Sequence, residues 1–287
     1  MKLKTFILVL VLVSLLAFKS DKPAYLIYGV KGKSVDYKEM LAEALKADIV
    51  LFGEYHDNPI THWLQLELTR DLFEKKKDGL ILGAEMFEAD DQLVLDEYLQ
   101  GLISEKKFES DCRLWANYKT DYKPLVNLAK EHNLKFVASN VPRRYASMVH
   151  MGGFEALETL SEEAKRYIPP LPIAYDGNLD CYKDMLKMGG MGHGGENLPK
   201  SQNLKDATMA HFILKNWSTG KTFLHYNGAY HSDKYESIVW HLKHSNSELK
   251  IMTITTVSQG TIAKLEKDNK GKADFTVCVP ETMTSTH

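Results

Sequence analysis

Two tetrapeptides with the frame Gly-x-x-His carry side chains that are suited to chemistry. Residues 53–56 read GEYH and residues 228–231 read GAYH, and each follows an apolar run. A carboxylate, Glu85, stands in a third apolar run, LILGAEMF, where a charged side chain is unusual. His56, His231 and Glu85 offer nitrogen and oxygen ligands that, with one open position, suit a divalent metal ion. Without a metal, a His–Glu pair can act as a general base and the group that orients it.

The same residues also have a purely structural explanation, because polar side chains at the ends of buried strands often bond to one another and stabilise the sheet edge. The tetrapeptides differ at one position, where GEYH adds the carboxylate of Glu54 and GAYH has Ala229. We therefore expect the first tetrapeptide to carry more of the chemistry. If the chain is an enzyme, the predicted catalytic residues are Glu54, His56, Glu85 and His231. The glycine of each tetrapeptide is expected to let the backbone turn sharply at the strand end.

The elements that position these residues alternate along the chain. Short apolar runs predict six strands, at residues 48–54, 79–87, 134–142, 221–228, 250–257 and 273–280. Segments with helical spacing lie before or between them, at residues 36–46, 59–76, 89–103, 122–133, 204–217 and 232–245. Apolar runs without strict alternation are typical of strands buried on both faces, as in parallel sheets. The pattern predicts an α/β fold, with a mainly parallel sheet flanked by helices on both faces.

We expect one domain over residues 21–287, with a helical and loop insertion at about 142–202. In open parallel sheets ligands bind beyond the carboxyl ends of the strands, where the four candidate residues lie. The insertion contains the proline-rich YIPPLPIAY and the glycine-rich MLKMGGMGHGGENLP, which suit a lid, a dimer contact or a segment without order. Tyr167, Tyr175 and Tyr182 lie in or beside its proline-rich part. Phenolate ligates ferric haem iron, although most tyrosines only pack and form hydrogen bonds.

The first twenty residues differ from the rest of the chain. Two lysines precede the apolar run 6–18, which is shorter than the roughly 20 residues of a membrane-spanning helix. We therefore expect a secretory signal peptide at residues 1–20 and an exported protein of the periplasm or cell envelope. The alternative is a buried N-terminal helix. The formal charge of −2 and the pI of about 6.6 give no electrostatic case for binding nucleic acid. The three cysteines form no CxxC pair and are expected to be buried structural thiols.

Five segments are found in order along the chain: GEYHDNPITHWLQLELTRDL, GAEMFEADDQLVLDEYLQG, ASNVPR, QNLKDATMAHFI and NGAYHSD. Together they resemble the ChaN-like haem-binding family of exported bacterial proteins, which is grouped with TIKI-type metalloproteases and erythromycin esterases. The resemblance extends from about residue 36 to residue 257. It implies an α/β core and iron-regulated haem binding at a dimer interface. There, a tyrosine of one subunit ligates the iron and a histidine of the other contacts a propionate.

The resemblance also implies which residues bind haem. Tyr175 is the first choice for the iron ligand, ahead of Tyr167 and Tyr182, and His193 is the expected propionate partner. Members of the family usually carry a lipid-modified cysteine near the N-terminus. The first twenty residues contain no cysteine, so membrane association stays open.

Two functions follow as alternatives. The first is an exported haem- or iron-binding protein, acting in iron acquisition or haem handling, with a homodimer implied by the resemblance. The second is a metal-dependent hydrolase, because the wider superfamily uses paired Gly-x-x-His motifs and a strand-end glutamate that match His56, His231 and Glu85. In both, the partner is haem or another small molecule. A purely structural role is a third alternative, since a fold alone does not determine a function.

Overall fold

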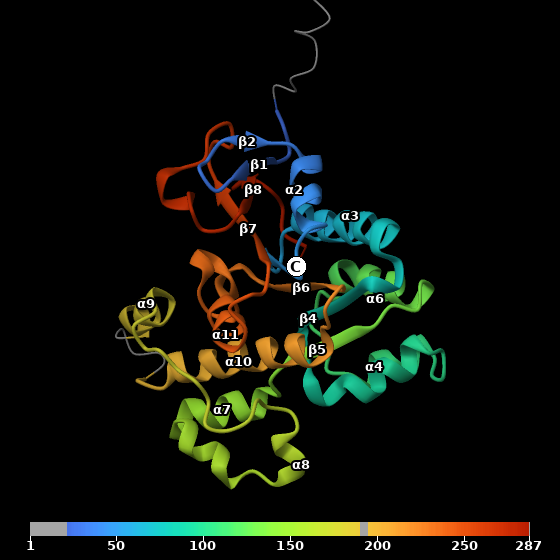
Figure 1. Ribbon diagram of the computed structural model, residues 1–287, viewed down its shortest axis with the longest axis vertical. Coiled ribbons are helices and arrows are strands. Elements are labelled where there is room, and N and C mark those ends of the chain that lie inside the picture. Colours follow the sequence, from blue (N-terminus) through green and yellow to red (C-terminus); the bar gives the residue numbers. More distant parts are fainter. Residues whose placement is uncertain (1–21, 190–194, 287) are drawn as a thin grey trace, which may run out of the picture.

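A computed structural model describes residues 22–189 and 195–286 of the chain (Figure 1). Its centre is one eight-stranded sheet in the order β2-β1-β8-β7-β3-β6-β4-β5. The strands are β1 Leu26–Gly29, β2 Ser34–Val35, β3 Ile49–Glu54, β4 Leu80–Glu88, β5 Phe136–Asn140, β6 Thr222–Gly228, β7 Ile251–Gln259 and β8 Phe275–Pro280. The six strands from β8 to β5 are parallel, whereas β1 pairs antiparallel with both β8 and β2. The predicted signal peptide lies outside the described residues.

The predicted mainly parallel α/β sheet is confirmed, and the six apolar runs form β3 to β8. The sequence pattern does not predict β1 and β2, which are four and two residues long and too short to show a period. Alternate side chains of β3 enter opposite cores. Val50 and Phe52 pack on one face of the sheet, and Ile49 and Leu51 pack on the other. The run is therefore apolar at successive positions because both faces of the strand are buried.

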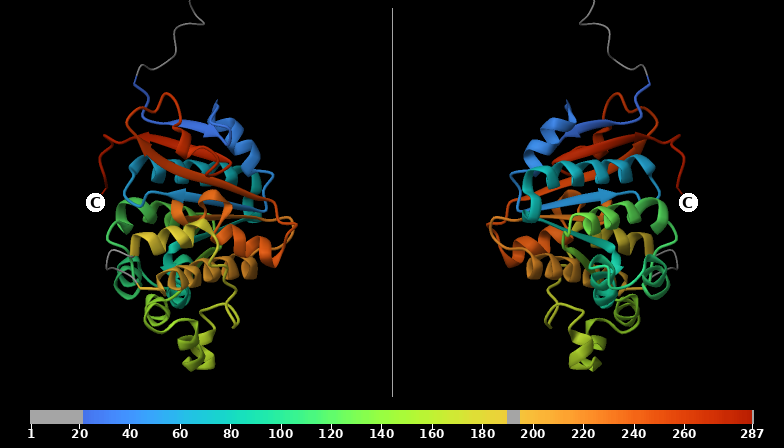
Figure 2. Two further views of the ribbon diagram at one scale, coloured as in Figure 1. Left: turned by 90° about the vertical axis from the view of Figure 1, so that its left-hand side faces the viewer. Right: turned by 90° about the vertical axis from the view of Figure 1, so that its right-hand side faces the viewer.

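Helices cover both faces of the sheet, as predicted. The main hydrophobic core lies between one face and helices α2 Tyr37–Ala44, α3 Pro59–Lys76, α4 Gln92–Leu99, α5 Glu105–Asp111 and α6 Lys123–Glu131. A second core lies between the other face and helices α10 Leu198–Asn216 and α11 Ile238–Ser245. In Figure 1, α3, α4 and α6 lie to the right of the sheet and α11 to its left, and Figure 2 shows these layers from either side.

Helix α3 begins directly behind the first tetrapeptide. Asn58 caps it, since its side-chain oxygen accepts a hydrogen bond from the backbone N–H of Thr61 at 3.0 Å. Pro59 follows in the first turn, where its missing N–H costs nothing. The cap fixes the length of the loop between β3 and α3. It thereby brings the first two turns of α3, with His62 and Gln65, over the end of β3.

The segment predicted as an insertion forms helices α7 Arg143–Gly152, α8 Glu162–Lys165 and α9 Asp180–Gly189. Side chains of α7 and of the loops around α8 build a small hydrophobic core, which Leu204 and Ala207 of α10 complete. Figure 1 shows α7 and α8 at the lower end of the molecule, beneath α10. The cysteines at positions 112, 181 and 278 are all buried and free, as expected. In the part of the chain that the structure describes, no helix has the length and apolar character needed to cross a membrane.

The glycines of the two tetrapeptides do not make sharp turns, contrary to expectation. Neither Gly53 nor Gly228 has a positive φ angle. Each instead leaves room for the other tetrapeptide. A Cβ on Gly53 would lie 2.9 Å from Cα of Ala229, and a Cβ on Gly228 would lie 2.9 Å from Nε2 of His56. The two segments interlock in this way because β3 and β6 are neighbours in the sheet, with Glu54 opposite Gly228.

We expect Gly53→Ala to lower the free energy of unfolding by about 1–3 kcal/mol, the usual cost of overpacking. The added methyl group would meet backbone atoms that cannot rotate away, Cα of Ala229 at 2.9 Å and the carbonyl oxygen of Ile254 at 3.0 Å. Gly79→Ala is the control, because a Cβ there would lie 4.0 Å from Cβ of Lys76, an ordinary contact, and its effect should stay within about 0.5 kcal/mol. Urea unfolding followed by circular dichroism measures both variants. If Gly53→Ala is as stable as Gly79→Ala, the two tetrapeptide segments do not interlock as described.

Candidate functional site

The carboxyl ends of β3, β4 and β6 open into a cavity of about 720 Å³. His56, Glu85 and His231 all line it, so three residues separated by up to 175 positions in sequence reach one site. A shallower cavity of about 410 Å³ adjoins it through His56 and His231 and lies between the two tetrapeptides. The two tetrapeptides thus line adjoining cavities at one end of the sheet.

His231 lies between two buried carboxylates. Its Nδ1 donates to Oδ1 of Asp206 at 2.5 Å, and its Nε2 lies 3.1 Å from Oε1 of Glu85. Burial by itself would lower the pKa of His231, but Glu85 and Asp206 raise it to about 10. The second oxygen of Glu85 accepts the backbone N–H of Gly228 at 2.7 Å. Burial would raise the pKa of Glu85, yet His231, His56 and this N–H hold it well below its usual range. The pair is therefore an ion pair at neutral pH.

His56 belongs to a second pair, with the fully buried carboxylate of Glu54. Oε1 of Glu54 lies 2.9 Å from Nδ1 of His56 and accepts the hydroxyl of Tyr122 at 2.7 Å. Its other oxygen accepts the Gln65 side-chain amide at 2.5 Å. Burial would lower the pKa of His56, but the Glu54 hydrogen bond and the charge of Glu85 raise it. The carboxylate thus holds the proton on Nδ1 and leaves Nε2, on a side chain that is 38% exposed, toward Gly228 and the cavity.

A further layer of polar side chains fixes the backbone of the first tetrapeptide. The carbonyl oxygen of His56 accepts two hydrogen bonds, from Nε2 of His62 at 3.0 Å and from the amide of Asn117 at 2.7 Å. Asn117 also donates to Asp121 at 2.7 Å. Asp121 and Tyr122 lie in a single π-helical turn, Tyr118–Tyr122, that precedes α6. Turns of this kind are frequent at functional sites because they redirect side chains that a regular helix would point elsewhere.

Sequence reasoning missed several residues of this network, all of them buried and polar: Gln65, Asn117, Asp121, Tyr122 and Asp206. One usable signal is in α10, whose predicted helical segment places an acid between alanine and leucine positions at Asp206. A charged residue on the buried face of a helix needs a partner, and that partner is His231. Tyr122 and Gln65 give no comparable signal, since both residue types are common in packed helices.

The predicted metal site at His56, Glu85 and His231 is not formed by the residues that the structure describes. Among them, no group of three His, Cys, Asp or Glu side chains is arranged to hold a metal ion. Two of the three predicted ligands, Glu85 and His231, are already engaged with partners. Both nitrogens of His231 face carboxylates, and both oxygens of Glu85 have partners. The paired residues, His56 with Glu54 and His231 with Glu85, fit acid–base chemistry, in which imidazole and carboxylate groups hold and move protons.

The three tyrosines predicted as haem ligands have different surroundings. Tyr182 has no exposed surface, and its hydroxyl donates to Asn203 at 3.1 Å and to Asp206 at 2.9 Å, so it is not accessible to a ligand. Tyr167 and Tyr175 are half-buried, and no hydrogen bond among the described residues uses either hydroxyl. Burial raises the pKa of Tyr175. The predicted propionate partner, His193, lies outside the described residues.

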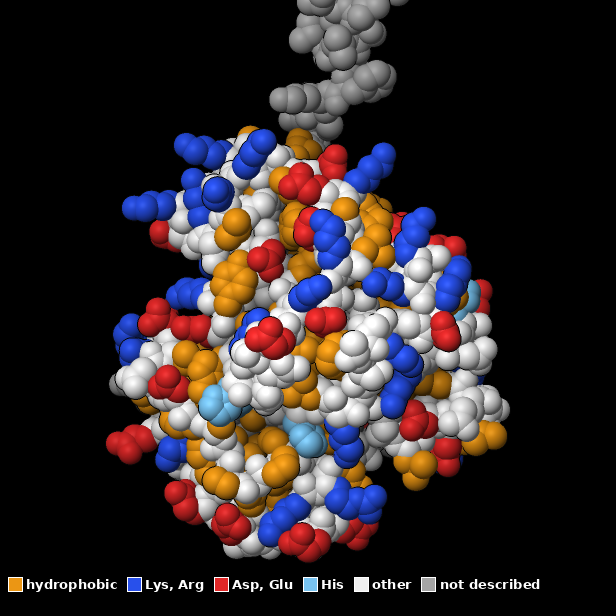
Figure 3. Space-filling model, viewed as in Figure 1, with side chains coloured by type: hydrophobic (Ala, Val, Ile, Leu, Met, Phe, Trp, Pro, Cys, Tyr) orange, Lys and Arg blue, Asp and Glu red, His pale blue; other side chains and the backbone are white. Residues whose placement is uncertain are grey.

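Apolar side chains are exposed near these tyrosines. Met151 of α7 is 74% exposed and Leu186 of α9 is 44% exposed. Tyr175 links the two regions, since its ring lies 5.7 Å from that of Phe154, just beyond α7, and 5.5 Å from that of Tyr182 in α9. Figure 3 shows hydrophobic side chains, with histidines among them, on the lower left part of the molecule. This insertion face, defined by Met151, Tyr175 and Leu186, is separate in its residues from the cavity at the strand ends.

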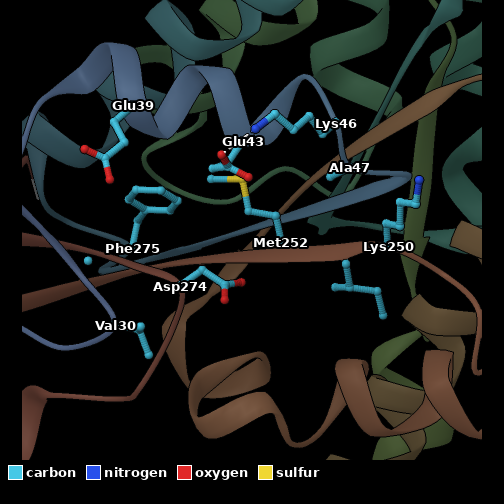
Figure 4. A pocket seen from close by; sticks show the side chains of 11 residues that line it. Val30, Glu39, Glu43, Lys46, Ala47, Lys250, Met252, Asp274 and Phe275 are labelled. Carbon is cyan, nitrogen blue, oxygen red and sulfur yellow. Dashed lines mark hydrogen bonds and ion pairs between the residues drawn. The ribbon is translucent and has the colours of Figure 1, made fainter.

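Another cavity, of about 440 Å³, lies where β7 and β8 begin, at the opposite end of these strands (Figure 4). Met252 and Phe275 form its apolar floor, and charged residues surround them. These charges are engaged with neighbours: Lys46 pairs with Glu43 at 2.6 Å, and Asp274 accepts the backbone N–H of Thr253 at 2.8 Å. The cavity has no histidine and no buried ion pair, so the chemistry concentrates at the carboxyl ends of the strands.

Comparison with known proteins agrees with this architecture. A family model described as "Haem-binding uptake, Tiki superfamily, ChaN" matches residues 40–242. The chain is similar to a solved structure entitled "Cofacial heme binding to ChaN of Campylobacter jejuni", at 20% identity and a TM-score of 0.66, covering 88% of this chain and 96% of that one. It is also similar to a Bacillus cereus protein at 13% identity and a TM-score of 0.50, covering 85% and 90% of the two chains. No curated protein matches. At these identities the structural likenesses show the fold alone.

The ion pair of His231 predicts a pH-dependent stability. The pKa of His231 rises from its ordinary value of 6.5 to about 10 in the folded chain, so its stabilising contribution is complete below pH 6.5 and is lost as the pH rises toward 10. We expect the free energy of unfolding of the wild type to fall with rising pH across this window. Its slope should be steeper than that of His231→Gln by up to about 1.4 kcal/mol per pH unit.

Urea unfolding at several pH values between 6.5 and 10 measures this dependence. The control is His244→Gln, because His244 is exposed on α11 and stacks on Trp240 outside the network. It should keep the wild-type slope. An unchanged slope in His231→Gln would show that the His231 ion pair does not supply the effect.

Proposed function

Because the chain belongs to the ChaN haem-binding uptake family of the Tiki superfamily, we propose that it binds haem. The observation that carries this proposal is the family match itself, which spans residues 40–242. That range contains strands β3 to β6 and the whole segment that forms α7, α8 and α9. The segment carries the exposed apolar side chains and the accessible tyrosines, so the family match and the local chemistry coincide in one part of the chain.

The insertion face offers the groups that haem requires. Exposed Met151 and Leu186 supply apolar contact for a porphyrin ring, whose burial is favourable. Tyr175 and Tyr167 have half-buried rings and hydroxyls without hydrogen-bond partners among the described residues. A tyrosine phenolate on this face could hold the ferric iron that haem would supply. Tyr175 is the first choice because its ring joins the α7 and α9 sides of the face.

Export, dimerisation and iron acquisition belong to the same proposal. The basic and apolar start of the chain supports export to the cell envelope. The resemblance to ChaN supports a homodimer in which His193 of a second copy approaches a propionate, and a role in iron acquisition or haem handling. N-terminal sequencing of the protein recovered from a bacterial envelope tests export, and an unprocessed N-terminus on cytosolic protein would contradict it.

We expect hemin to bind the purified protein with a saturable shift of its Soret band. Tyr175→Phe should weaken this binding at least about tenfold, equivalent to about 1.4 kcal/mol, because it removes the phenolate ligand. The control is Tyr235→Phe, since Tyr235 is an exposed tyrosine whose hydroxyl bonds Asp274 away from the insertion face. Titration followed by absorbance measures all three proteins.

Two outcomes separate the parts of this prediction. No saturable shift in the wild type would exclude haem binding by this chain. A normal shift in Tyr175→Phe that is lost in Tyr167→Phe would assign the iron ligand to Tyr167, the second choice. Tyr182→Phe should bind haem as the wild type does, because its hydroxyl is buried against Asn203 and Asp206.

Hydrolysis is a second candidate function, supported by the geometry of His56. Glu54 holds the Nδ1 side of the ring at 2.9 Å and leaves Nε2 toward the cavity, which is the arrangement of a general base and its orienting carboxylate. The Glu85–His231 ion pair lies beside it and lines the same cavity. A metal-dependent mechanism fits these residues less well than predicted, because both nitrogens of His231 and both oxygens of Glu85 already have partners. The residues support hydrolysis by acid–base catalysis.

We expect small chromogenic carboxylic esters to be hydrolysed, with His56→Ala lowering kcat/KM by about 10²–10⁴-fold through loss of the base. His244→Ala should have no effect, since this residue is exposed on α11. Added chelator should leave the rate unchanged. No turnover of esters by the wild type, or equal turnover by His56→Ala, would contradict hydrolysis at this site. Activity that the chelator abolishes would restore the metal-dependent alternative.

A further inference from the structure

One cation at the main cavity has no partner in the described part of the chain. Lys205, on α10, is half-buried and lines the cavity of about 720 Å³ that His56 and His231 also line. No hydrogen bond or ion pair of the described residues uses its ammonium group. A carboxylate nearby could pair with this ammonium group. The neighbouring Asp206 does not pair with Lys205, because it is fully buried and faces His231 and Tyr182.

The carboxylates at the rim of the cavity are already neutralised. Three acids at the end of β4 pair with three guanidinium groups: Glu88, Asp90 and Asp91 with Arg113, Arg143 and Arg144. The remaining acid that lines the cavity, Glu85, pairs with His231 at 3.1 Å. Lys205 is therefore a surplus positive charge. Arg143 adds hydrogen-bond donors but no further net charge, since it pairs with Glu88 through Nε while none of the described hydrogen bonds uses its terminal nitrogens.

A second, independent feature of the cavity points to a ligand. Asn140, at the end of β5, lines the cavity and is only 9% exposed, yet its side-chain oxygen has no hydrogen-bond partner. Buried amide groups are nearly always paired, because an unpaired one loses its hydration without compensation. The amide can present either its oxygen or its NH₂ group after a rotation of the side chain. The unpaired oxygen is itself shielded from solvent, so a bound molecule would pair with this amide after such a rotation.

Another wall of the cavity is apolar. Leu114, Trp115 and Ala116 line it from the segment between α5 and α6, and Val141 lines it beyond β5. The Trp115 ring packs edge-on against the ring of His56, with centroids 4.8 Å apart. A volume near 720 Å³ is within the usual range for a small-molecule site, which combines apolar walls with a few polar groups. The cavity at the opposite sheet end, lined by Met252 and Phe275, has no such unpaired buried group (Figure 4).

We propose that the cavity at the carboxyl ends of the strands binds a small organic anion, an aromatic or apolar body that carries a carboxylate or phosphate recognised by Lys205. The apolar wall takes the body of the ligand, Lys205 and Arg143 take its charge, and Asn140 takes a neighbouring polar atom. The ligand would then lie beside Nε2 of His56. This inference is independent of haem binding, which uses the insertion face, and it does not require turnover, because binding alone is measured.

Isothermal titration of the purified protein, without added haem, tests the proposal with three aromatic probes. Benzoate and phenyl phosphate carry the two anionic groups, and benzamide is the neutral analogue of benzoate. We expect saturable binding of at least one anion, at least about tenfold tighter than benzamide, since a hydrogen-bonded charge contributes about this much. The tighter anion identifies which of the two groups the site prefers.

The variants Lys205→Met and Lys205→Gln should each weaken the anion at least about tenfold and bring it to the affinity of benzamide. Lys250→Met is the matched control, because Lys250 lines the opposite cavity and should leave the affinity unchanged. The proposal is overturned if neither benzoate nor phenyl phosphate binds saturably. Equal affinity for benzamide, or retained affinity in either folded Lys205 variant, overturns it as well. Hemin titration of Lys205→Met should match the wild type, which separates this result from a failure of haem binding.

Discussion

The close approach of the ends of β3 and β6 is the constraint on which the rest of the site depends. Gly53 lies against the backbone of Ala229, and Gly228 lies against the imidazole of His56, so each tetrapeptide fills the space that a side chain on the other would take. The same approach aims the Gly228 N–H at Glu85. A larger residue at either glycine would move a histidine away from its carboxylate. The glycines are therefore explained by space, and their backbone angles are ordinary.

This constraint makes buried charge tolerable. Charged groups inside a protein are costly unless they are paired and hydrogen-bonded. Glu54 accepts hydrogen bonds from Tyr122 and Gln65 besides its contact with His56, and His231 lies between Glu85 and Asp206. Because these groups satisfy one another, they are poor metal ligands. Among the described residues that line the cavity, the polar groups left without a partner are Nε2 of His56, the side-chain oxygen of Asn140 and the ammonium of Lys205.

The fold keeps two surfaces of different chemistry apart. The sheet end gathers charged and hydrogen-bonded groups, since parallel strands deliver their loops to one edge. The insertion face instead exposes apolar side chains and tyrosine rings on helices that pack against α10. Helix α10 contributes to both, because Leu204 and Ala207 complete the core of the insertion while Lys205 and Asp206 face the cavity and its ion pair.

The sequence by itself determined the six parallel strands, the helices between them and the identity of His56, Glu85 and His231 as groups at strand ends. It could do so because burial on both faces of a strand, and on one face of a helix, sets a local pattern of apolar residues. It did not determine β1 and β2, which are too short to show a pattern, or the reason for Gly53 and Gly228. Only the tertiary structure decided the partners of each histidine. Tyr122, Asp206 and Lys205 come from distant helices, and their roles follow from distances that no local pattern encodes.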